Sequence, residues 1–330
     1  MLALSVLDQT PVPEGTDPAQ ALADTIRLAQ AADRLGYTRY WLAEHHNTRS
    51  LAGTTPEVMV AAVASATSRI RVGSGGVLLP YRNPMMVAEA FRMLHSLFPG
   101  RIDLGVGRAA GTDPATEELL RRGPVELGEE WFPQQVADLV GYVHDNETMP
   151  AGSGAPAVWL LGSSSQSSGC AAYLGLAFSF AHFISPTYGP QIVNAYRRGF
   201  QRSEVLDEPR VSVAVSVVCA DTDEEARRVA STADLWRLGP EGAERAPIVP
   251  SADAAAVVAT LTDLQRERLA QAKSKVIVGA PDVVRAKMTT LADEFGINEL
   301  IVLTVCHDPR ARQRSYELLA EAFSLSSGAR

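Results

Sequence analysis

The strongest constraint on the fold is a regular alternation of apolar segments and helical segments along the whole chain. Eight segments are rich in β-branched and aromatic residues, which favours strands, and a helical pattern follows each of them. They read LALSVLDQ, RYWLAEHH, RIRVGSGGVLL, RIDLGVG, AVWLLGSSS, LAFSFAHF, RVSVAVSVVCADT and ELIVLTV. Eight such units in 330 residues predict an α/β fold, a (β/α)8 TIM barrel. A doubly wound open sheet is the alternative, because the same alternation permits it.

The alternation is interrupted once, after the seventh strand. A polar segment over residues 238–253, rich in Pro, Gly and Glu, predicts a long loop, and residues 254–273 predict a helix. A short strand, KVIVG, follows. We therefore expect one domain over residues 1–330 with an insertion at about 238–275. Earlier in the chain, the pattern predicts a long helical region from Pro114 to about His144, broken around residues 123–128.

The charge of the chain narrows the class of partner. Asp and Glu outnumber Lys and Arg by 38 to 30, for a formal net charge of −8. Nucleic acids and anionic membranes bind basic surfaces, so we expect neither as a partner and expect a small-molecule ligand instead. The start, MLALSVLDQTP, lacks a basic leader segment, and no apolar run approaches the ~20 residues that span a bilayer. These features predict a cytoplasmic protein. Its three cysteines show no C-x-x-C spacing, so no zinc site is indicated.

Residues 105–110, GVGRAA, match the dinucleotide-binding pattern G-x-G-x-x-G/A. In that motif the third small residue enters a helix directly, and an acidic residue ends the next strand. Here the next helix begins beyond the motif, near Pro114, and the next strand ends at Gly162 and Ser163 without an acid. The dinucleotide interpretation is therefore disfavoured.

The same stretch suits a phosphate-binding role better. Arg108 follows the fourth strand among small residues, and a planar guanidinium group is well matched to phosphate. The fifth strand ends with Gly162, Ser163 and Ser164, where hydroxyls and the N–H groups of a helix N-terminus bind anions. Together these two strand ends predict a site for a phosphomonoester. The alternative is a turn of small residues beside a solvated arginine.

The second strand ends in the polar run Glu44, His45, His46 and Asn47. Catalytic residues of barrels lie at such strand ends, and imidazole is the side chain best suited to move protons near pH 7. Neighbouring residues of a strand point to opposite faces, so at most one of the two histidines faces a ligand. This geometry disfavours a metal site. The alternative is a strand end in which Glu44 pairs with a neighbouring cation.

Two further features fall on strand ends. Gly75 and Gly76 interrupt an apolar strand, which indicates a bulge, a distorted peptide or the close approach of a flat ligand. A bend at a barrel corner is the alternative. His182 is a lone histidine in an apolar run. Such a residue is more often part of the core, and we assign it, like Glu44, only to the lining of a substrate pocket.

Taken together, these strand ends resemble a known family, the bacterial luciferase-like flavin monooxygenases. The similar stretches are YWLAEHHN, RIRVGSGGVLLPYRNPMMVAEAFRMLHSLFPGRIDLGVGRAAGTD, LLGSSSQSS, VIVGAPDVVRAKMTTLADEFGI and RSYELLAEAF. They cover nearly all of the chain and look most like the single-chain, alkanal-monooxygenase-like members. The resemblance implies a (β/α)8 barrel, reduced FMN as co-substrate and activation of O2 through a flavin C4a-hydroperoxide.

The resemblance also implies roles for the phosphate-site residues. Arg108 matches the family arginine that binds the FMN phosphate, and Ser163 matches a second phosphate contact. Luciferase has an acidic residue where this chain has Gly162, so that contact falls to the backbone or to Ser164. Gly107 stands where luciferase has its reactive cysteine. No property of that thiol is therefore expected here.

Two more positions carry over from the family. Gly75 and Gly76 match the small-residue pair that forms a non-prolyl cis peptide beneath the isoalloxazine ring. His45 matches the active-site histidine, which can serve as a base during oxygenation. The expected enzyme is thus a two-component monooxygenase: a separate flavin reductase supplies FMNH2, and the peroxide attacks an aldehyde, ketone or aromatic substrate. Residues 238–253 would close over the site and exclude water.

Other functions on the same fold stay open at this point. An oxidoreductase that uses the deazaflavin F420 would carry out hydride transfer on the same scaffold. A flavin-binding subunit without catalysis is a further possibility, which the presence of His45 disfavours, and a metal-dependent hydrolase is the most distant one. By resemblance we expect a homodimer formed through the helices after the second and third strands. Trp236, Tyr81 and Phe183 could shape the pocket, but the sequence does not define the substrate, because loops vary freely on this fold.

Overall fold

The computed structural model describes residues 2–108, 112–121, 129–152, 154–239, 245 and 247–326. Its strands form one parallel sheet in the order β6-β5-β4-β3-β2-β1-β9-β7-β8, and an additional β6–β7 pairing closes the sheet. The strands are β1 (Ala3–Asp8), β2 (Arg39–Leu42), β3 (Arg71–Leu78), β4 (Ile102–Gly107), β5 (Ala157–Gly162), β6 (Ala177–Ala181), β7 (Val211–Cys219), β8 (Val276–Gly279) and β9 (Glu299–Leu303). The predicted TIM barrel is confirmed, and the open-sheet alternative is excluded.

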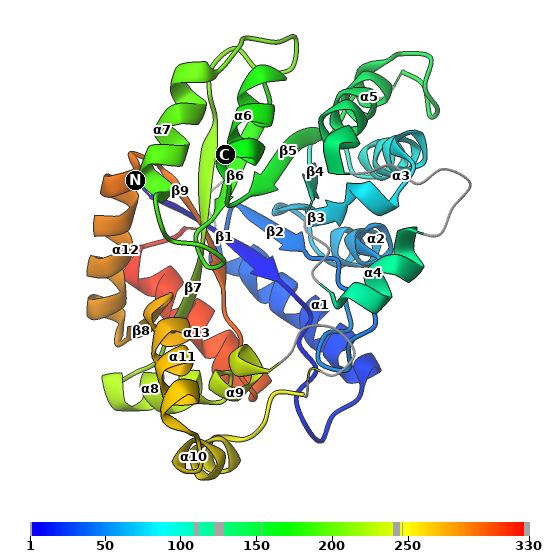
Figure 1. The fold of residues 1–330 in the computed structure, drawn as a ribbon. Coiled ribbons are helices and arrows are strands. Elements are labelled where there is room, and N and C mark those ends of the chain that lie inside the picture. The colour runs from blue at the N-terminus through cyan, green and yellow to red at the C-terminus, as the bar shows by residue number, and fades with distance from the viewer. Residues whose placement is uncertain are drawn as a thin grey trace.

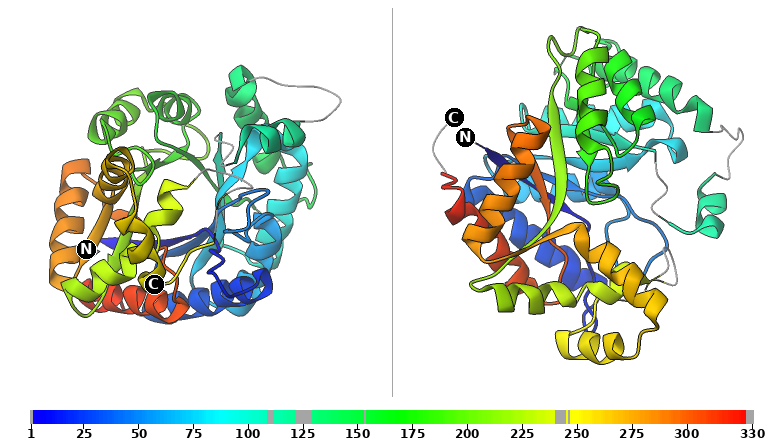
Figure 2. Two further views of the ribbon diagram at one scale, coloured as in Figure 1. Left: turned by 60° about the horizontal axis from the view of Figure 1, so that its bottom comes forward. Right: turned by 60° about the vertical axis from the view of Figure 1, so that its left-hand side comes forward.

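Helices surround this barrel on the outside (Figures 1 and 2). They are α1 (Pro18–Leu35), α2 (Pro56–Ala66), α3 (Pro84–Leu97), α4 (Pro114–Arg121), α5 (Phe132–His144), α6 (Ser165–Tyr173), α7 (Gly189–Gly199), α8 (Asp223–Ser231), α9 (Asp234–Leu238), α10 (Ser251–Ala259), α11 (Asp263–Ser274), α12 (Pro281–Phe295) and α13 (Pro309–Ala322), with 3-10 turns η1 (Leu79–Tyr81) and η2 (Glu129–Trp131). Several begin with proline at the first turn, where its missing N–H group costs no hydrogen bond.

Each barrel strand buries both of its faces, as parallel sheets require. In β9, Leu300 and Val302 belong to the apolar layer between strands and helices. Ile301 and Leu303 alternate with them and pack inside the barrel in one cluster with Trp41. The period of two along the strand therefore separates an outer core from an inner one.

A buried network of charges closes the end of the barrel at which the strands begin. Arg39, at the start of β2, donates from Nη1 to Asp103 Oδ2 at 2.6 Å and from Nε to Glu299 Oε1 at 2.5 Å. Its guanidinium carbon lies 4.8 Å from the ring centre of Trp159, which meets Trp41 edge-on at 5.3 Å. Burial raises the pKa of Asp103, but the charges of Arg39 and Arg71 and the hydrogen bonds to Asp103 together outweigh it and lower the pKa overall. These contacts fill the interior of the barrel at this end, and the sequence-predicted site residues lie at the other end, where the strands finish.

The insertion after the seventh strand is present but differs from the prediction in detail. Residues 254–273 do not form one helix: α10 ends at Ala259 and α11 begins at Asp263. The break has a physical cause, because Thr262 forms a capping box with Gln265 and so starts a new helix. The predicted loop over 238–253 is also shorter, since α9 ends at Leu238 and α10 starts at Ser251.

Three other predictions are adjusted. The second strand stops at Leu42, so the polar run from Glu44 onward belongs to the loop that follows. The helical region from Pro114 consists of α4 and α5, and its expected break lies outside the described residues. The short KVIVG strand, β8, pairs with the last four residues of β7 and stays out of the closed ring.

Candidate functional site

Most of the predicted site residues lie at the ends of four neighbouring strands. The loop after β2 carries His45, β3 contains the glycine pair, Arg108 follows β4, and Gly162 ends β5. These strands pair with one another in that order, β2 with β3, β3 with β4 and β4 with β5. Because the strands are parallel, the four ends meet on one side of the open end of the barrel (Figure 2).

The glycine pair produces the distortion that the sequence predicts. The peptide bond between Gly75 and Gly76 is cis, and the register of β3 against β4 shifts between Gly75 and Val77. A Cβ atom on Gly76 would lie 2.8 Å from the carbonyl oxygen of Gly105, and one on Gly75 would lie 2.8 Å from Trp41 Cβ. Neither position therefore accommodates a side chain without movement of its neighbours, and β3 presents bare backbone at this point.

Glu44 is fully buried and joins the loop after β2 to the end of β3. Its carboxylate accepts from the backbone N–H of Leu78 at 2.9 Å, from His46 Nε2 at 2.7 Å and from Arg82 Nη2 at 2.8 Å. Burial raises the pKa of Glu44, but these hydrogen bonds and the Arg82 charge outweigh it and lower the pKa overall. The ion pair that the sequence left as an alternative is present, and we give Glu44 a positioning role.

His45 lies next to this anchored residue. Its backbone N–H donates to the carbonyl oxygen of Gly53 at 2.8 Å, and its Nδ1 atom is buried without a hydrogen-bond partner. Burial, together with the positive charges of Arg245 and His46, lowers the pKa of His45 to about 4. The imidazole is therefore neutral at pH 7 and can either donate or accept a hydrogen bond.

Arg108 connects the ends of β4 and β5. Its Nη1 donates to Oε1 of Gln166 at 2.6 Å, and Gln166 lies in the first turn of α6. The guanidinium group is thereby held beside the N-terminus of this helix, where the first N–H groups have no partner within the helix. The two halves of the predicted phosphate site are thus adjacent.

The start of α6 explains why residue 162 is glycine. A Cβ atom there would lie 2.4 Å from Oγ of Ser167. Ser164 caps the helix by accepting from the Ser167 N–H at 3.2 Å, and its hydroxyl lies 3.1 Å from Ser167 Oγ. Because this hydroxyl is already engaged, Ser163 is the serine better able to contact a ligand.

His182 lies in a different environment. Phe178 and Phe180 point outward from β6 and belong to the outer core. His182 lies two residues further along the chain and points to the same side. Its ring meets Phe295 of α12 edge-on at 6.0 Å. Burial lowers the pKa of His182. These contacts match a core residue, the alternative named from the sequence, and we leave His182 out of the proposed site.

Several contributors were not found from the sequence. Arg82 and Gln166 have no motif that marks them, and their contacts join residues far apart in the chain. Trp236 of α9 packs against the inner core, and the guanidinium carbon of Arg245 lies 4.6 Å from its ring centre. Trp236 was considered from the sequence as a residue that could shape the pocket, whereas Arg245 lies in the predicted polar insertion and no motif marks it or its effect on His45.

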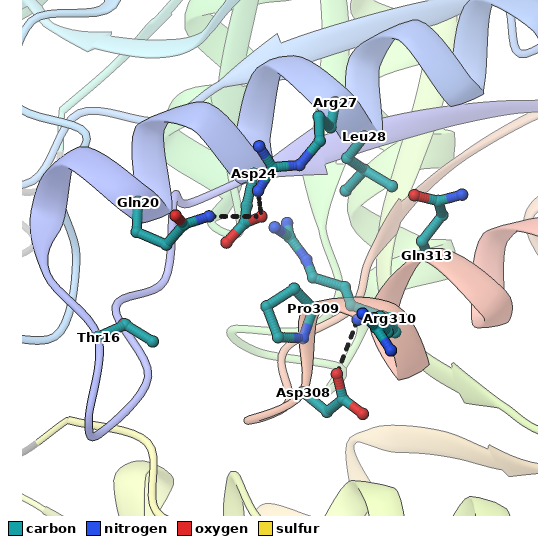
Figure 3. A pocket seen from close by; sticks show the side chains of 10 residues that line it. Thr16, Gln20, Asp24, Arg27, Leu28, Asp308, Pro309, Arg310 and Gln313 are labelled. Atoms are coloured by element: carbon teal, nitrogen blue, oxygen red, sulfur yellow. Dashed lines mark hydrogen bonds and ion pairs between the residues drawn. The ribbon is translucent and has the colours of Figure 1, made fainter.

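A cavity of about 370 Å³ opens between α1 and α13 (Figure 3). Its polar side chains bind one another: Asp24 accepts from Gln20 at 3.2 Å and pairs with Arg27. None of the predicted site residues lines it.

Among the described residues, no group of three or more His, Cys, Asp or Glu could hold a metal ion. No helix in that part of the chain is long and apolar enough to cross a membrane.

The fold defines a TIM-barrel protein, and the strand-end residues form a candidate ligand site at one side of the barrel opening. Residues 2–299 match the family model of luciferase-like monooxygenases, and the chain belongs to this family. YwcH of Bacillus subtilis is 42% identical and aligns over 98% of this chain and 100% of its own. An N-acetyl-S-alkylcysteine monooxygenase of B. subtilis is 32% identical over 98% of both chains. The crystal structure of apo-MsnO8 has 40% identity and a TM-score of 0.90, and the match covers 99% of both chains.

Proposed function

We propose that the chain is a flavin-dependent monooxygenase that uses reduced FMN and O2 to oxygenate a small organic substrate. The observation that carries the proposal is the convergence of Arg108, the α6 N-terminus and the Gly75–Gly76 backbone at neighbouring strand ends. A separate flavin reductase would supply the reduced cofactor. The 3,6-diketocamphane monooxygenase oxygenating constituent, solved with FMN, shares the fold with a TM-score of 0.70.

The residues fit the phosphate end of FMN. Arg108 supplies a planar cation, and the first turn of α6 supplies backbone N–H groups and the Ser163 hydroxyl beside it. Helix N-termini and arginine are the groups that proteins use most for phosphate. Gln166 holds the guanidinium group in place through its 2.6 Å hydrogen bond. We assign Arg108 and Ser163 as the first phosphate contacts, with Gly162 and Ser164 shaping the turn.

The other end of the cofactor needs a flat surface. Gly75 and Gly76 expose backbone without side chains at the end of β3, and Glu44 fixes that segment through the Leu78 N–H. An isoalloxazine ring can lie against such a surface. When bound there, reduced FMN supplies the electrons that activate O2.

His45 is the residue that we assign to proton handling. Its imidazole is neutral, and its Nδ1 atom is buried and unpartnered, so it can accept a hydrogen bond from a ligand or donate one to it. A pKa of about 4 makes His45 a weak base in the free protein. We therefore expect it to hold or orient a proton on the bound ligand rather than to store one beforehand.

The helices after β7 supply the other wall of the site. Trp236 packs against the inner core, and the positive charge of Arg245 reaches His45. We propose that residues 238–253 close over the ligand and exclude water, which protects reactive intermediates. Six residues of this segment, 240–244 and 246, lie outside the described residues.

The remaining expectations concern assembly and location. Helices α2 and α3 carry exposed apolar side chains. We propose that two copies of the chain associate through these two helices. Location in the cytoplasm stays a prediction.

Anaerobic titration of the chain with FMNH2, followed by mixing with ¹⁸O2 and candidate substrates, tests the function. Binding of FMNH2 and transfer of one ¹⁸O atom into a product support a monooxygenase. Binding of F420 with anaerobic hydride transfer would instead support a deazaflavin oxidoreductase, as in the F420-dependent secondary alcohol dehydrogenase that shares the fold with a TM-score of 0.64. Binding of FMNH2 without turnover of any substrate would favour a flavin-binding subunit.

A further inference from the structure

A second cavity, of about 260 Å³, lies at the opposite end of the barrel, where the strands begin. Four basic side chains line it: Arg71 at the start of β3, His95 of α3, His144 of α5, and Arg210 just before β7. The rest of its lining includes Trp159 and a run of small apolar residues, 155–158. None of these residues belongs to the proposed flavin site.

Two residues that line the cavity, Trp159 and His95, carry buried polar atoms without partners. The Trp159 side chain is fully buried, and its Nε1–H group donates to no acceptor. Nδ1 of His95 is also buried without a partner. Buried polar groups in folded proteins are nearly always hydrogen-bonded, and an indole N–H can only donate. The indole N–H group of Trp159 therefore lacks the acceptor that a buried donor normally has.

The cations at the cavity outnumber their carboxylates. Asp103 binds both Arg39 and Arg71, and Glu299 binds Arg39. Arg210 forms no ion pair within the described residues, although its guanidinium carbon lies 5.0 Å from the ring centre of Trp159. One guanidinium group thus remains without an anionic partner beside an indole N–H without an acceptor.

The electrostatics of the neighbouring groups agree with this excess of positive charge. Burial and the charge of Arg39 lower the pKa of Arg210, and Glu299 and Asp103 only partly oppose them. Burial and the charges of Arg71 and Arg92 lower the pKa of His95. Burial and Arg92 also lower the pKa of His144, against an opposing effect of Glu204. An anion in the cavity would favour the charged form of each group.

We propose that this cavity is a binding site for a small organic carboxylate, distinct from the flavin site. The carboxylate would bind between Arg210, Arg71 and the indole N–H of Trp159, and its short aliphatic part would lie against the apolar wall of residues 155–158. A carboxylate offers two planar acceptor oxygens, which match the fork of an arginine. The apolar wall favours an organic anion over a fully hydrated inorganic one.

The site can be tested on the full chain without reference to activity. The protein has four tryptophans, so ¹⁵N labelling gives four indole N–H signals, and Trp159→Phe identifies the one of interest. Titration with butyrate is expected to shift this signal saturably and to raise the Tm, because a ligand that binds only the folded state stabilises it. Prior saturation with FMN is expected to leave the titration unchanged.

Arg210→Ala is expected to weaken butyrate binding by about tenfold or more, as loss of a charge-assisted contact predicts. Arg202→Ala is the matched control: it removes an exposed arginine that pairs with Asp207 at 2.7 Å outside the cavity. Equal weakening by both variants, or no shift of the Trp159 signal at 100-fold excess over protein, would overturn the proposal. Binding of inorganic phosphate without butyrate would overturn the assignment to a carboxylate.

Discussion

Arg108 donates a hydrogen bond of 2.6 Å to Gln166 and thereby joins the end of β4 to the first turn of α6. The two residues are 58 positions apart in the sequence. Their contact places a cation at the N-terminal end of a helix dipole, which on its own is unfavourable for a positive charge. A bound phosphate would balance both, which supports our proposal that the pair forms part of an anion site.

The first prediction concerns this pair. Arg108→Ala is expected to weaken FMN binding by about 100-fold, or about 3 kcal/mol, because bidentate charge-assisted hydrogen bonds are lost. Arg108→Lys should recover part of the loss, since it keeps the charge but not the planar fork. Fluorescence quenching of FMN measures both. Gln166→Ala, which removes only the orienting amide, should cost less than Arg108→Ala; an equal cost would place the phosphate elsewhere.

The glycine pair gives the second prediction. Gly76→Ala is expected to lower the free energy of unfolding by about 1–3 kcal/mol, because a Cβ atom would lie 2.8 Å from the Gly105 carbonyl oxygen. FMN binding should weaken as well. Gly141→Ala in α5 is the matched control, since a Cβ atom there meets nothing within 4 Å and alanine stabilises a helix by about 0.5–1 kcal/mol. Urea unfolding measures the free energy of unfolding of both variants. The prediction is wrong if Gly76→Ala is as stable as the wild type.

Several of these features could be predicted from the sequence, and the reason is local. Glycine in the middle of an apolar strand has few explanations, so the distortion at Gly75 and Gly76 could be located before the fold was known. Arg108 and Ser163 follow strands directly, and parallel strands bring such ends together. The position of each residue along its own strand was therefore enough to predict that these residues lie at neighbouring strand ends.

The features that could not be predicted depend on long-range packing. Strands of a parallel barrel are apolar on both faces, so the sequence around His182 could not show that it points outward toward Phe295. Glu44 forms its ion pair with Arg82, which lies 38 positions later in the sequence. No sequence spacing predicts a contact between these two residues. The division of residues 254–273 into two helices was missed for a different reason: the capping box of Thr262 and Gln265 is local and is visible in the sequence, but the apolar pattern alone does not show it.

The third prediction concerns Glu44. Glu44→Gln is expected to lower the free energy of unfolding by about 2–3 kcal/mol at pH 7, because it leaves the partly buried Arg82 with only its weaker partner, Glu57, at 3.1 Å. The folded-state pKa of Glu44 is lowered, so its contribution is present above the unfolded pKa of ~4.3 and is lost as the pH falls below it. Urea unfolding at pH 3 and pH 7 should therefore show a smaller difference between variant and wild type at pH 3. A constant difference would contradict the assignment.

The fourth prediction concerns His45. Its folded-state pKa is about 4, against 6.5 for the unperturbed side chain, so the unfolded chain binds the additional proton first as the pH falls. Stability should therefore decrease as the pH drops from ~6.5 to ~4 through this residue. His45→Gln keeps a neutral polar side chain and should flatten the pH dependence of unfolding in that range. An unchanged profile in the variant would show that His45 is not held neutral.

The last prediction concerns association of two copies. On α3, Met86, Met93 and Leu97 are 68%, 56% and 63% exposed and recur at helical spacing, and Val58 of the contacting helix α2 is 65% exposed. Exposed apolar surface marks interaction sites, and we propose that these side chains pair with those of a second copy in a two-fold dimer. Met86→Glu combined with Met93→Glu is expected to convert the proposed dimer to a monomer, because each copy would place two carboxylates in the shared interface, four in total. Sedimentation velocity measures the change. Leu119→Glu in α4, a residue 54% exposed and outside this patch, should leave the dimer intact; a wild-type chain that sediments as a monomer at micromolar concentration would rule out the interface.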